Sequence, residues 1–385
     1  MQPGGRRFDP CTLHCKILAA GAAGISFFRI PPEKPAGSPT FEQMPSLSRL
    51  SHALEKLVGV PPSLRARLTI ALLIAAFAGA IVHREYSANP GHHSDFGMLW
   101  FGARSLIEGE NPYDLIGPGK EFDYRWRLIY PGTALVAVIP LTQLSEHAAA
   151  VVFVVVSSAA LAFGATRSGL HLLPLFATES FVSAARLGQW SILFCAALYS
   201  PFISMLAVVK PQASIPIIAA SVKRKPYLWA LVGGLILTAI SLTLLPSWPV
   251  NWLSGVSASE NMEPPVSRLG GLLILLVLLR WRRPESWLVL SLACMPQSWG
   301  WYGALPLFLI PNTFFESVVL AAAATFGAYL GAMIVPGTGS ADVFFGWVGS
   351  MIVFTIYLPA VLIVLRRPNV GPSPAWLELS VLRRR

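Results

Sequence analysis

Apolar residues occur along this chain in long uninterrupted blocks, with the polar residues collected in short stretches between them. Residues 189–209, 226–246 and 341–365 hold almost no ionisable side chains. About 20 apolar residues in a helix suffice to cross roughly 30 Å of hydrocarbon. Neither strand-like alternation nor the period of a soluble amphipathic helix runs through these blocks. The pattern predicts an all-α, polytopic transmembrane bundle and excludes a soluble globular protein.

The other apolar blocks complete the predicted bundle, which would have about 10–12 spans in total. The first span is expected at residues 67–83. The later spans are expected at residues 129–144, 148–166, 170–185, 189–209, 213–222, 226–246, 269–281, 285–297, 299–311, 314–336 and 341–365. Several blocks are short and contain or adjoin proline, which favours broken or re-entrant helices bordering protein or a wet cavity.

Four regions follow from this pattern. Residues 1–43 are rich in Pro and Gly and are expected to be a disordered extension. Residues 44–65 place leucines at helical spacing among basic residues, which predicts an amphipathic helix on the cytoplasmic surface. Residues 66–365 are the expected transmembrane domain, and residues 366–385 are a basic tail.

The longest polar stretch, residues 84–128, follows the first span. Its charges are of both signs, as is common for a segment on the outer side. From Phe96 to Ile107, apolar residues recur at every third or fourth position. This spacing predicts a short helix with one apolar face lying along the membrane surface.

Charge gives the bundle an orientation. Only 12% of the residues are charged, against about 25% in ordinary soluble domains. The net charge of +10 comes from 29 basic and 19 acidic residues, and the excess lies at the two ends of the chain. The positive-inside rule then predicts cytoplasmic termini, an outward-facing segment 84–128 and a plasma (inner) membrane location. The basic residues flank apolar blocks, so nucleic acid is not an expected partner.

Polar groups in or beside apolar blocks are costly to keep in hydrocarbon, which makes them the candidate functional residues. Asp95 immediately precedes the predicted surface helix, where its carboxylate suits a general base at the lipid–water boundary or an ordinary helix N-cap. Lys210 ends an apolar block on the predicted outer side. It suits a phosphate ligand or a side chain that reaches to the interface.

Two further groups of residues stand out. Glu179 and Arg186 share one helix face, as part of a site or as a structural ion pair. Gln297, Trp299 and Tyr302 separate two short apolar segments, where aromatic rings suit sugar stacking or an aromatic belt. The four cysteines form no recognisable disulfide framework or zinc motif, so no metal is expected.

Five short motifs occur in a fixed order along the chain: Ser94-Asp95-Phe96, Asn111-Pro112-Tyr113-Asp114, Tyr130-Pro131, Gly188-Gln189 and Lys210-Pro211-Gln212. Over residues 66–365 this order resembles family 87 of the class C glycosyltransferases, the polyprenol-phosphate-mannose-dependent mannosyltransferases. The chain departs from the family pattern in the short interval between the last two motifs. It also has Gly132 where a second proline is usual after Tyr130-Pro131.

The resemblance implies a class C glycosyltransferase-like bundle with Asp95 as catalytic base. The chain would transfer a hexose, mannose in this family, from a polyprenyl-phosphate sugar to a lipid or glycan acceptor among membrane lipids. Such a lipid-linked donor requires neither a cofactor nor a metal. The donor phosphate is then expected to contact the cationic candidates Lys210, Arg186 and Arg104. The expected substrate contacts are Tyr130, Gln189, Gln212, Gln297, Trp299, Tyr302 and Glu179.

The main alternative is a multi-pass transporter or a lipid or polysaccharide flippase. Such proteins typically show inverted repeats and paired charges near the bilayer midplane, where only Glu179 and Arg186 qualify here. The long outer segment is easier to explain as a catalytic cap than as a transporter connection. A purely structural assembly partner would have no use for Asp95.

Cysteines introduced at positions 117 and 380 test the predicted orientation, in a chain whose own four cysteines have been replaced by serine. A membrane-impermeant thiol reagent applied to intact cells should label position 117 and leave position 380 unlabelled. The reverse pattern would place Asp95 on the cytoplasmic side and contradict the orientation.

Overall fold

The computed structural model describes residues 58–88, 94–124, 126–258, 262–297, 300–334 and 341–371. The expected extension 1–43, most of segment 44–65 and the tail beyond residue 371 lie outside these ranges. The protein is 75% helical, which confirms the all-α prediction. In the described part, β-structure is confined to two short parallel strands, β1 (Ile116–Gly117) and β2 (Phe122–Asp123).

Five apolar helical segments of the described chain are each long enough to cross a membrane. They are Leu64–Ala88 (α3), Glu146–Ser168 (α7, Glu146–Ala165, with η3, Thr166–Ser168), Lys225–Leu244 (α11), Phe314–Met333 (within α14, Phe314–Ile334) and Gly346–Leu365. The last comprises most of α15 (Ala341–Ile352), the π-helical turn η10 (Val353–Tyr357) and α16 (Leu358–Leu365). All five coincide with predicted spans, which supports a multi-pass membrane protein.

The remaining predicted spans are short helices, many of them 3₁₀-helical. The 189–209 block, expected as one span, is split into α9 (Trp190–Ala196) and η5 (Pro201–Val209), because Pro201 cannot continue the first helix. The others are α6 (Gly132–Val138), η2 (Ile139–Gln143), η4 (Leu173–Ala177), α8 (Glu179–Arg186), α10 (Pro211–Ala219), η7 (Gly271–Arg280), α13 (Pro284–Cys294) and η8 (Trp301–Leu309). Two further short helices, α12 (Trp248–Ser257) and η6 (Pro265–Ser267), lie between the predicted spans 226–246 and 269–281.

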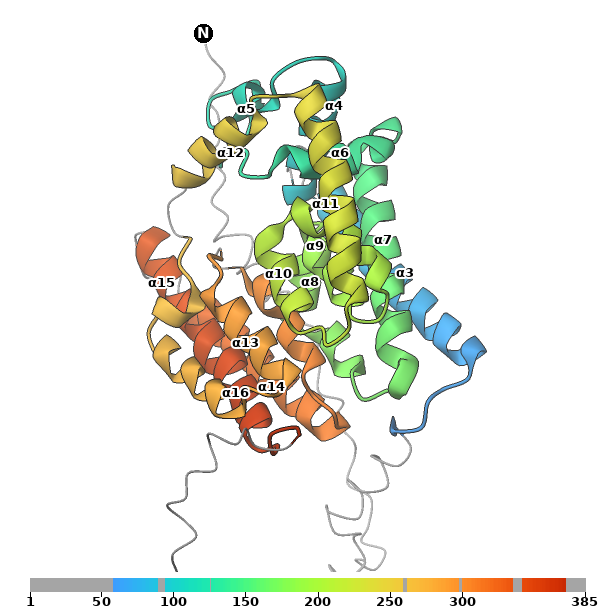
Figure 1. Ribbon diagram of the computed structural model, residues 1–385, viewed down its shortest axis with the longest axis vertical. Helices are drawn as coiled ribbons and strands as arrows, with labels where there is room; N and C mark the ends of the chain where they lie inside the picture. Colours follow the sequence, from blue (N-terminus) through green and yellow to red (C-terminus); the bar gives the residue numbers. More distant parts are fainter. Residues whose placement is uncertain are drawn as a thin grey trace, which may run out of the picture.

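Figure 1 shows how these helices are arranged. The helices α4 (Asp95–Ile107), α5 (Pro112–Leu115) and α12 gather at the upper end. The turn between α10 and α11, which contains Lys223 and Arg224, lies below them, and the last turn of α16 lies near the bottom. Helices α13 to α16 pack together at the lower left, beside the group formed by α8, α9 and α10.

The predicted helix after the first span is present as α4, but its apolar face is covered by protein. Phe96, Leu99 and Ala103 are fully buried and pack against α6, α7 and η2, whereas Ile107 remains 52% exposed. The expectation that this face lies on the membrane surface was therefore wrong. The apolar side chains of α4 instead form its packing contacts with the rest of the bundle.

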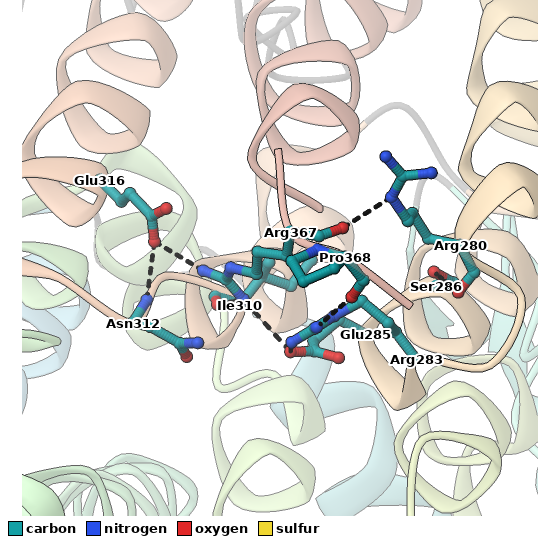
Figure 2. Close-up of polar contacts among 9 residues, drawn as sticks. All are labelled: Arg280, Arg283, Glu285, Ser286, Ile310, Asn312, Glu316, Arg367 and Pro368. Atoms are coloured by element: carbon teal, nitrogen blue, oxygen red, sulfur yellow. Dashed lines mark hydrogen bonds and ion pairs between the residues drawn. The ribbon is translucent and has the colours of Figure 1, made fainter. Parts of the chain in front are cut away.

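A network of charged residues joins the start of α13, the first turn of α14 and the end of α16 (Figure 2). Arg367, just after α16, donates to Glu285 at the start of α13 over 3.2 Å and to Glu316 in the first turn of α14 over 2.6 Å. Arg280 donates to the main-chain carbonyls of Leu365 and Arg367, and Arg283 to that of Pro368. The arginines thereby satisfy carbonyls that the end of α16 leaves without helical partners.

The electrostatics of Glu285 reflect this network. Burial by itself would raise the pKa of its carboxyl group. The hydrogen bond from Arg283, with the charges of Arg283 and Arg367, holds the pKa below its usual value. A depressed carboxyl pKa contributes stability that is present above the unfolded value and is lost as the pH falls. The network thus helps to hold α13, α14 and α16 together near neutral pH.

Replacing Arg367 by methionine should destabilise the protein, because it leaves two largely buried carboxylates without their shared cation. Loss of one partner from a buried ion pair costs about 3–5 kcal/mol. The neighbouring Arg366 is exposed and serves as the matched control. In thermal unfolding of the detergent-solubilised protein, Arg367→Met should lower the midpoint by several degrees more than Arg366→Met. Equal midpoints would show that the network contributes no stability.

Candidate functional site

Three polar side chains from distant parts of the sequence meet at the first residue of α4. The side-chain amide of Gln189, between α8 and α9, donates through Nε2 to Oδ2 of Asp95. Its Oε1 accepts a hydrogen bond of 2.6 Å from Nζ of Lys210, between η5 and α10. One amide group therefore connects a carboxylate to an ammonium.

Two tyrosines complete this group. The Tyr130 hydroxyl lies 3.4 Å from Nζ of Lys210, and the Lys210 ammonium lies 5.2 Å from the centre of the Tyr130 ring. On another side the same ammonium lies 5.4 Å from the ring of Tyr302. The two electron-rich ring faces add cation–π attraction to the hydrogen bonds of the ammonium. We call Asp95, Gln189, Lys210, Tyr130 and Tyr302 the central cluster.

The position of Gln189 depends on the glycine before it. Gly188 has φ +64, a left-handed conformation that favours glycine. A Cβ atom on Gly188 would lie 2.6 Å from Cβ of Phe96. The main-chain N–H of Phe96 also donates to the carbonyl of Leu187 over 3.2 Å. The tight turn after α8 thus lets the chain pass against the start of α4, which brings Gln189 to Asp95.

The structure rejects the interpretation of Asp95 as a helix N-cap. That position belongs to Ser94, whose hydroxyl accepts from the main-chain N–H of Gly97 over 3.1 Å. Tyr86, near the end of α3, holds the same hydroxyl with a hydrogen bond of 2.7 Å. Since capping is provided by Ser94, the Asp95 carboxylate is directed to Gln189 instead.

Burial differs within the central cluster in a way that matters for ligand access. Gln189 is only 1% exposed, and Tyr130 is also buried. Asp95 and Lys210 are half-buried. The bridging amide is therefore sealed inside the protein, while the carboxylate and the ammonium on either side of it remain reachable.

Lys210 lies outside the five long spans, and its charge is affected by its surroundings. Burial lowers the pKa of the ammonium to about 8, and the nearby Asp95 carboxylate acts in the opposite direction. A lysine in this state is still mostly protonated at neutral pH. It can therefore supply a positive charge that solvent screens only weakly.

The structure does not bring all the predicted cations into the central cluster. Arg104 is exposed on α4, where it pairs with Glu108 over 3.3 Å and stacks on the ring of Trp100. Arg186 and Glu179 stand at opposite ends of α8 and influence each other electrostatically. Within the described part of the chain, neither forms a hydrogen bond or ion pair with the central cluster. Their predicted roles in holding the donor stay predictions without geometric support.

The other predicted substrate contacts are Gln212, Gln297 and Trp299, and none of them belongs to the central cluster. Gln212 is half-buried in the first turn of α10, two residues after Lys210. Gln297 is buried, and its side-chain amide donates to the hydroxyl of Tyr357 over 3.2 Å. A Cβ on Gly303, the residue after Tyr302, would lie 2.9 Å from Oε1 of Gln297. Trp299 lies outside the described residues.

The arrangement favours reactions that need one base and one cation. A half-buried carboxylate can accept a proton, and the ammonium can stabilise a negatively charged group. Across the described residues, no three His, Cys, Asp or Glu side chains lie together in a way that would hold a metal ion.

No family model, curated protein or solved structure matches this sequence. The resemblance to family 87 therefore rests on the five motifs alone. Residues from four of them meet at one place in the fold: Asp95, Tyr130, Gln189 and Lys210. The remaining motif, which contains Tyr113, is tied to them by a hydrogen bond of 2.8 Å from the Tyr113 hydroxyl to the carbonyl of Tyr130.

Proposed function

We propose that this chain is an integral membrane hexosyltransferase that takes its sugar, mannose by resemblance, from a polyprenyl-phosphate donor. The acceptor is a lipid or glycan hydroxyl on the outer face of the membrane. Asp95 is the general base and Lys210 binds the donor phosphate. The observation that carries this proposal is the bridge from Asp95 through the Gln189 amide to Lys210.

The bridge keeps two opposite charges apart, so that each remains able to interact with a substrate. A carboxylate and an ammonium in direct contact neutralise each other, which weakens the base and occupies the cation. The neutral amide of Gln189 stabilises both charges through hydrogen bonds and keeps its own position by being buried. A substrate can then use the carboxylate and the ammonium for different tasks in one reaction.

Sugar transfer supplies those tasks. The oxygen of the acceptor hydroxyl attacks the anomeric carbon of the donor, and the bond between that carbon and the phosphate oxygen breaks. The acceptor proton passes to the Asp95 carboxylate, and polyprenyl phosphate leaves with the bonding electron pair. Lys210 stabilises the charge that develops on the departing phosphate. Tyr302, which is half-buried beside Lys210, offers an aromatic ring against which a sugar can pack.

The distribution of segments in the fold is in keeping with an outward-facing site. Helices α4, α5 and α12 lie at one end of the molecule, and basic turns lie toward the other (Figure 1). Positive charge favours the cytoplasmic side. In the proposed reaction the lipid-linked donor enters sideways from the bilayer, with its phosphate at the depth of the lipid headgroups.

Asp95→Asn tests the base directly. Asparagine keeps the shape of the side chain and can still accept the Gln189 hydrogen bond, and the α4 cap provided by Ser94 is untouched. The variant should bind donor normally and lose about 100-fold or more in transfer rate, the scale expected for loss of a general base. The measurement is release of polyprenyl phosphate from a polyprenyl-phosphate mannose in membranes that contain the native acceptors.

The matched control for this variant is Asp123→Asn, because Asp123 is exposed in the same outer segment and accepts a local hydrogen bond from Gly119. It should transfer sugar at the wild-type rate. Wild-type transfer by Asp95→Asn would refute the base assignment. If, in addition, vesicles showed lipid or sugar flux that depends on the protein, the transporter alternative would replace the proposal.

Lys210→Met should raise the apparent Kd for the donor by about tenfold or more, since it removes a charge-assisted hydrogen bond but retains the apolar stem. Because the pKa of Lys210 is about 8, donor affinity of the wild type should fall as the pH rises through that value. The variant should lack this dependence. The exposed Lys225 provides the control, Lys225→Met. Unchanged donor affinity in Lys210→Met would exclude it as the phosphate ligand.

A further inference from the structure

A second cation, which sequence reasoning did not single out, lies in the connection between η6 and η7. Arg268 is half-buried there. Its Nη2 donates to two main-chain carbonyls, those of Glu263 and Gln297, each over 2.9 Å. These bonds fix the plane of the guanidinium group without neutralising its charge.

The rest of the guanidinium is available for a ligand. An arginine carries five N–H donors, and two of them serve the two carbonyls. Among the described residues, no carboxylate lies within ion-pair distance of Arg268. The more distant charge of Glu263 acts to raise the pKa of the guanidinium group. The strongest effect on the group is burial, which lowers the pKa of Arg268. A fixed, partly buried guanidinium with free donors is a favourable binding group for an oxyanion.

The helix packed against Arg268 is shaped around those donors. Gly349, in α15, is buried against the arginine side chain. A Cβ on Gly349 would lie 3.1 Å from both Nε and Nη1 of Arg268. Any larger residue at this position would therefore press against Nε and Nη1, which have no acceptor in the described structure.

A chain of contacts connects Arg268 to the central cluster. Gln297 accepts from Arg268 through its main-chain carbonyl, and its side-chain amide approaches Gly303. The neighbouring Tyr302 lies beside the ammonium of Lys210. The same amide of Gln297 donates to Tyr357, which ends the π-helical turn η10. Such irregular turns within helices occur frequently at functional sites.

We propose that Arg268 binds a phosphate group of a membrane lipid, as a second anion-binding residue beside the central cluster. Among oxyanions, phosphate is the one that the bilayer presents at the depth of its headgroups. The N–H groups of Nε and Nη1 can each donate a charge-assisted hydrogen bond to a phosphate oxygen. The inference rests on the proposed function in one respect, because a lipid-phosphate donor would supply one of its two possible ligands. The other is the phosphate of an ordinary phospholipid.

Binding measurements on the full chain in detergent test this proposal without any transfer reaction. The probes are a short polyprenyl phosphate, the corresponding polyprenol and phosphatidylglycerol. Arg268→Met should weaken binding of one of the two phosphate-bearing lipids by about tenfold or more, the usual effect of losing a charge-assisted contact. Binding of the polyprenol should not change. Whichever phosphate lipid is affected identifies the source of the phosphate.

Two more variants keep the test decisive. Gly349→Ala keeps the charge of Arg268 but places a methyl group against Nε and Nη1, so it should weaken binding of the same phosphate lipid. Arg127→Met removes an exposed arginine of the outer segment and should have no effect. If Arg268 has a purely structural role, Arg268→Met should unfold at a lower temperature than the wild type. In that case Gly349→Ala should bind the phosphate lipids as tightly as the wild type does.

The proposal is overturned if Arg268→Met and Gly349→Ala bind both phosphate lipids as the wild type does. It is also overturned if the wild type does not prefer the polyprenyl phosphate or phosphatidylglycerol to the polyprenol. These outcomes are separate from the test of Asp95. A catalytically inactive Asp95→Asn protein should still lose phosphate binding when Arg268 is replaced.

Discussion

The structure around the central cluster depends on one constraint, the free energy cost of holding opposite charges inside an apolar bundle. Asp95 and Lys210 are both drawn away from water, and each needs a hydrogen-bond partner there. Gln189 serves both at once, with its amide donating on one side and accepting on the other. Since an amide has a donor end and an acceptor end, the neighbours of Gln189 can only be an acceptor and a donor, in that order.

The short helices of the bundle follow from the same requirement. Gln189 and Lys210 both lie at breaks between helices, where a side chain can reach the interior without extending from a helix face. The breaks expose main-chain groups that would be costly in lipid, so they must be enclosed by protein. The long helices α3, α7 and α11 and the cap formed by α4 provide that enclosure. At the other end, Arg367 solves a similar problem for two carboxylates by direct pairing.

The sequence predicted the features that depend on local chemistry. Long apolar blocks identified α3, α7, α11 and α14, since the number of residues needed to cross a bilayer is fixed. Sequence also singled out Asp95 and Lys210, because isolated charges beside apolar blocks are rare. It could not decide whether Asp95 is a base or the N-cap of α4, because that choice depends on the hydrogen bond between Ser94 and Gly97 and on the position of Gln189.

Features that depend on long-range packing were beyond sequence reasoning. The apolar face of α4 has the pattern of a membrane-surface helix, and nothing local reveals that α6 and α7 cover it. Arg268 resembles many loop arginines in sequence. Its fixed guanidinium becomes evident only when Gln297 and Gly349 are placed beside it. Arg104 and Arg186 were predicted as phosphate ligands because of their positive charge. In the folded protein neither side chain belongs to the central cluster.

The most direct test of the central claim is a double-mutant cycle on the transfer rate, with Asp95→Asn, Lys210→Met and the double variant. If the two residues act on one substrate through the bridge of Gln189, their effects are coupled. The double variant should then lose little more activity than the more damaged single variant. Losses that multiply, as for independent residues, would contradict the claim that Asp95 and Lys210 form one site.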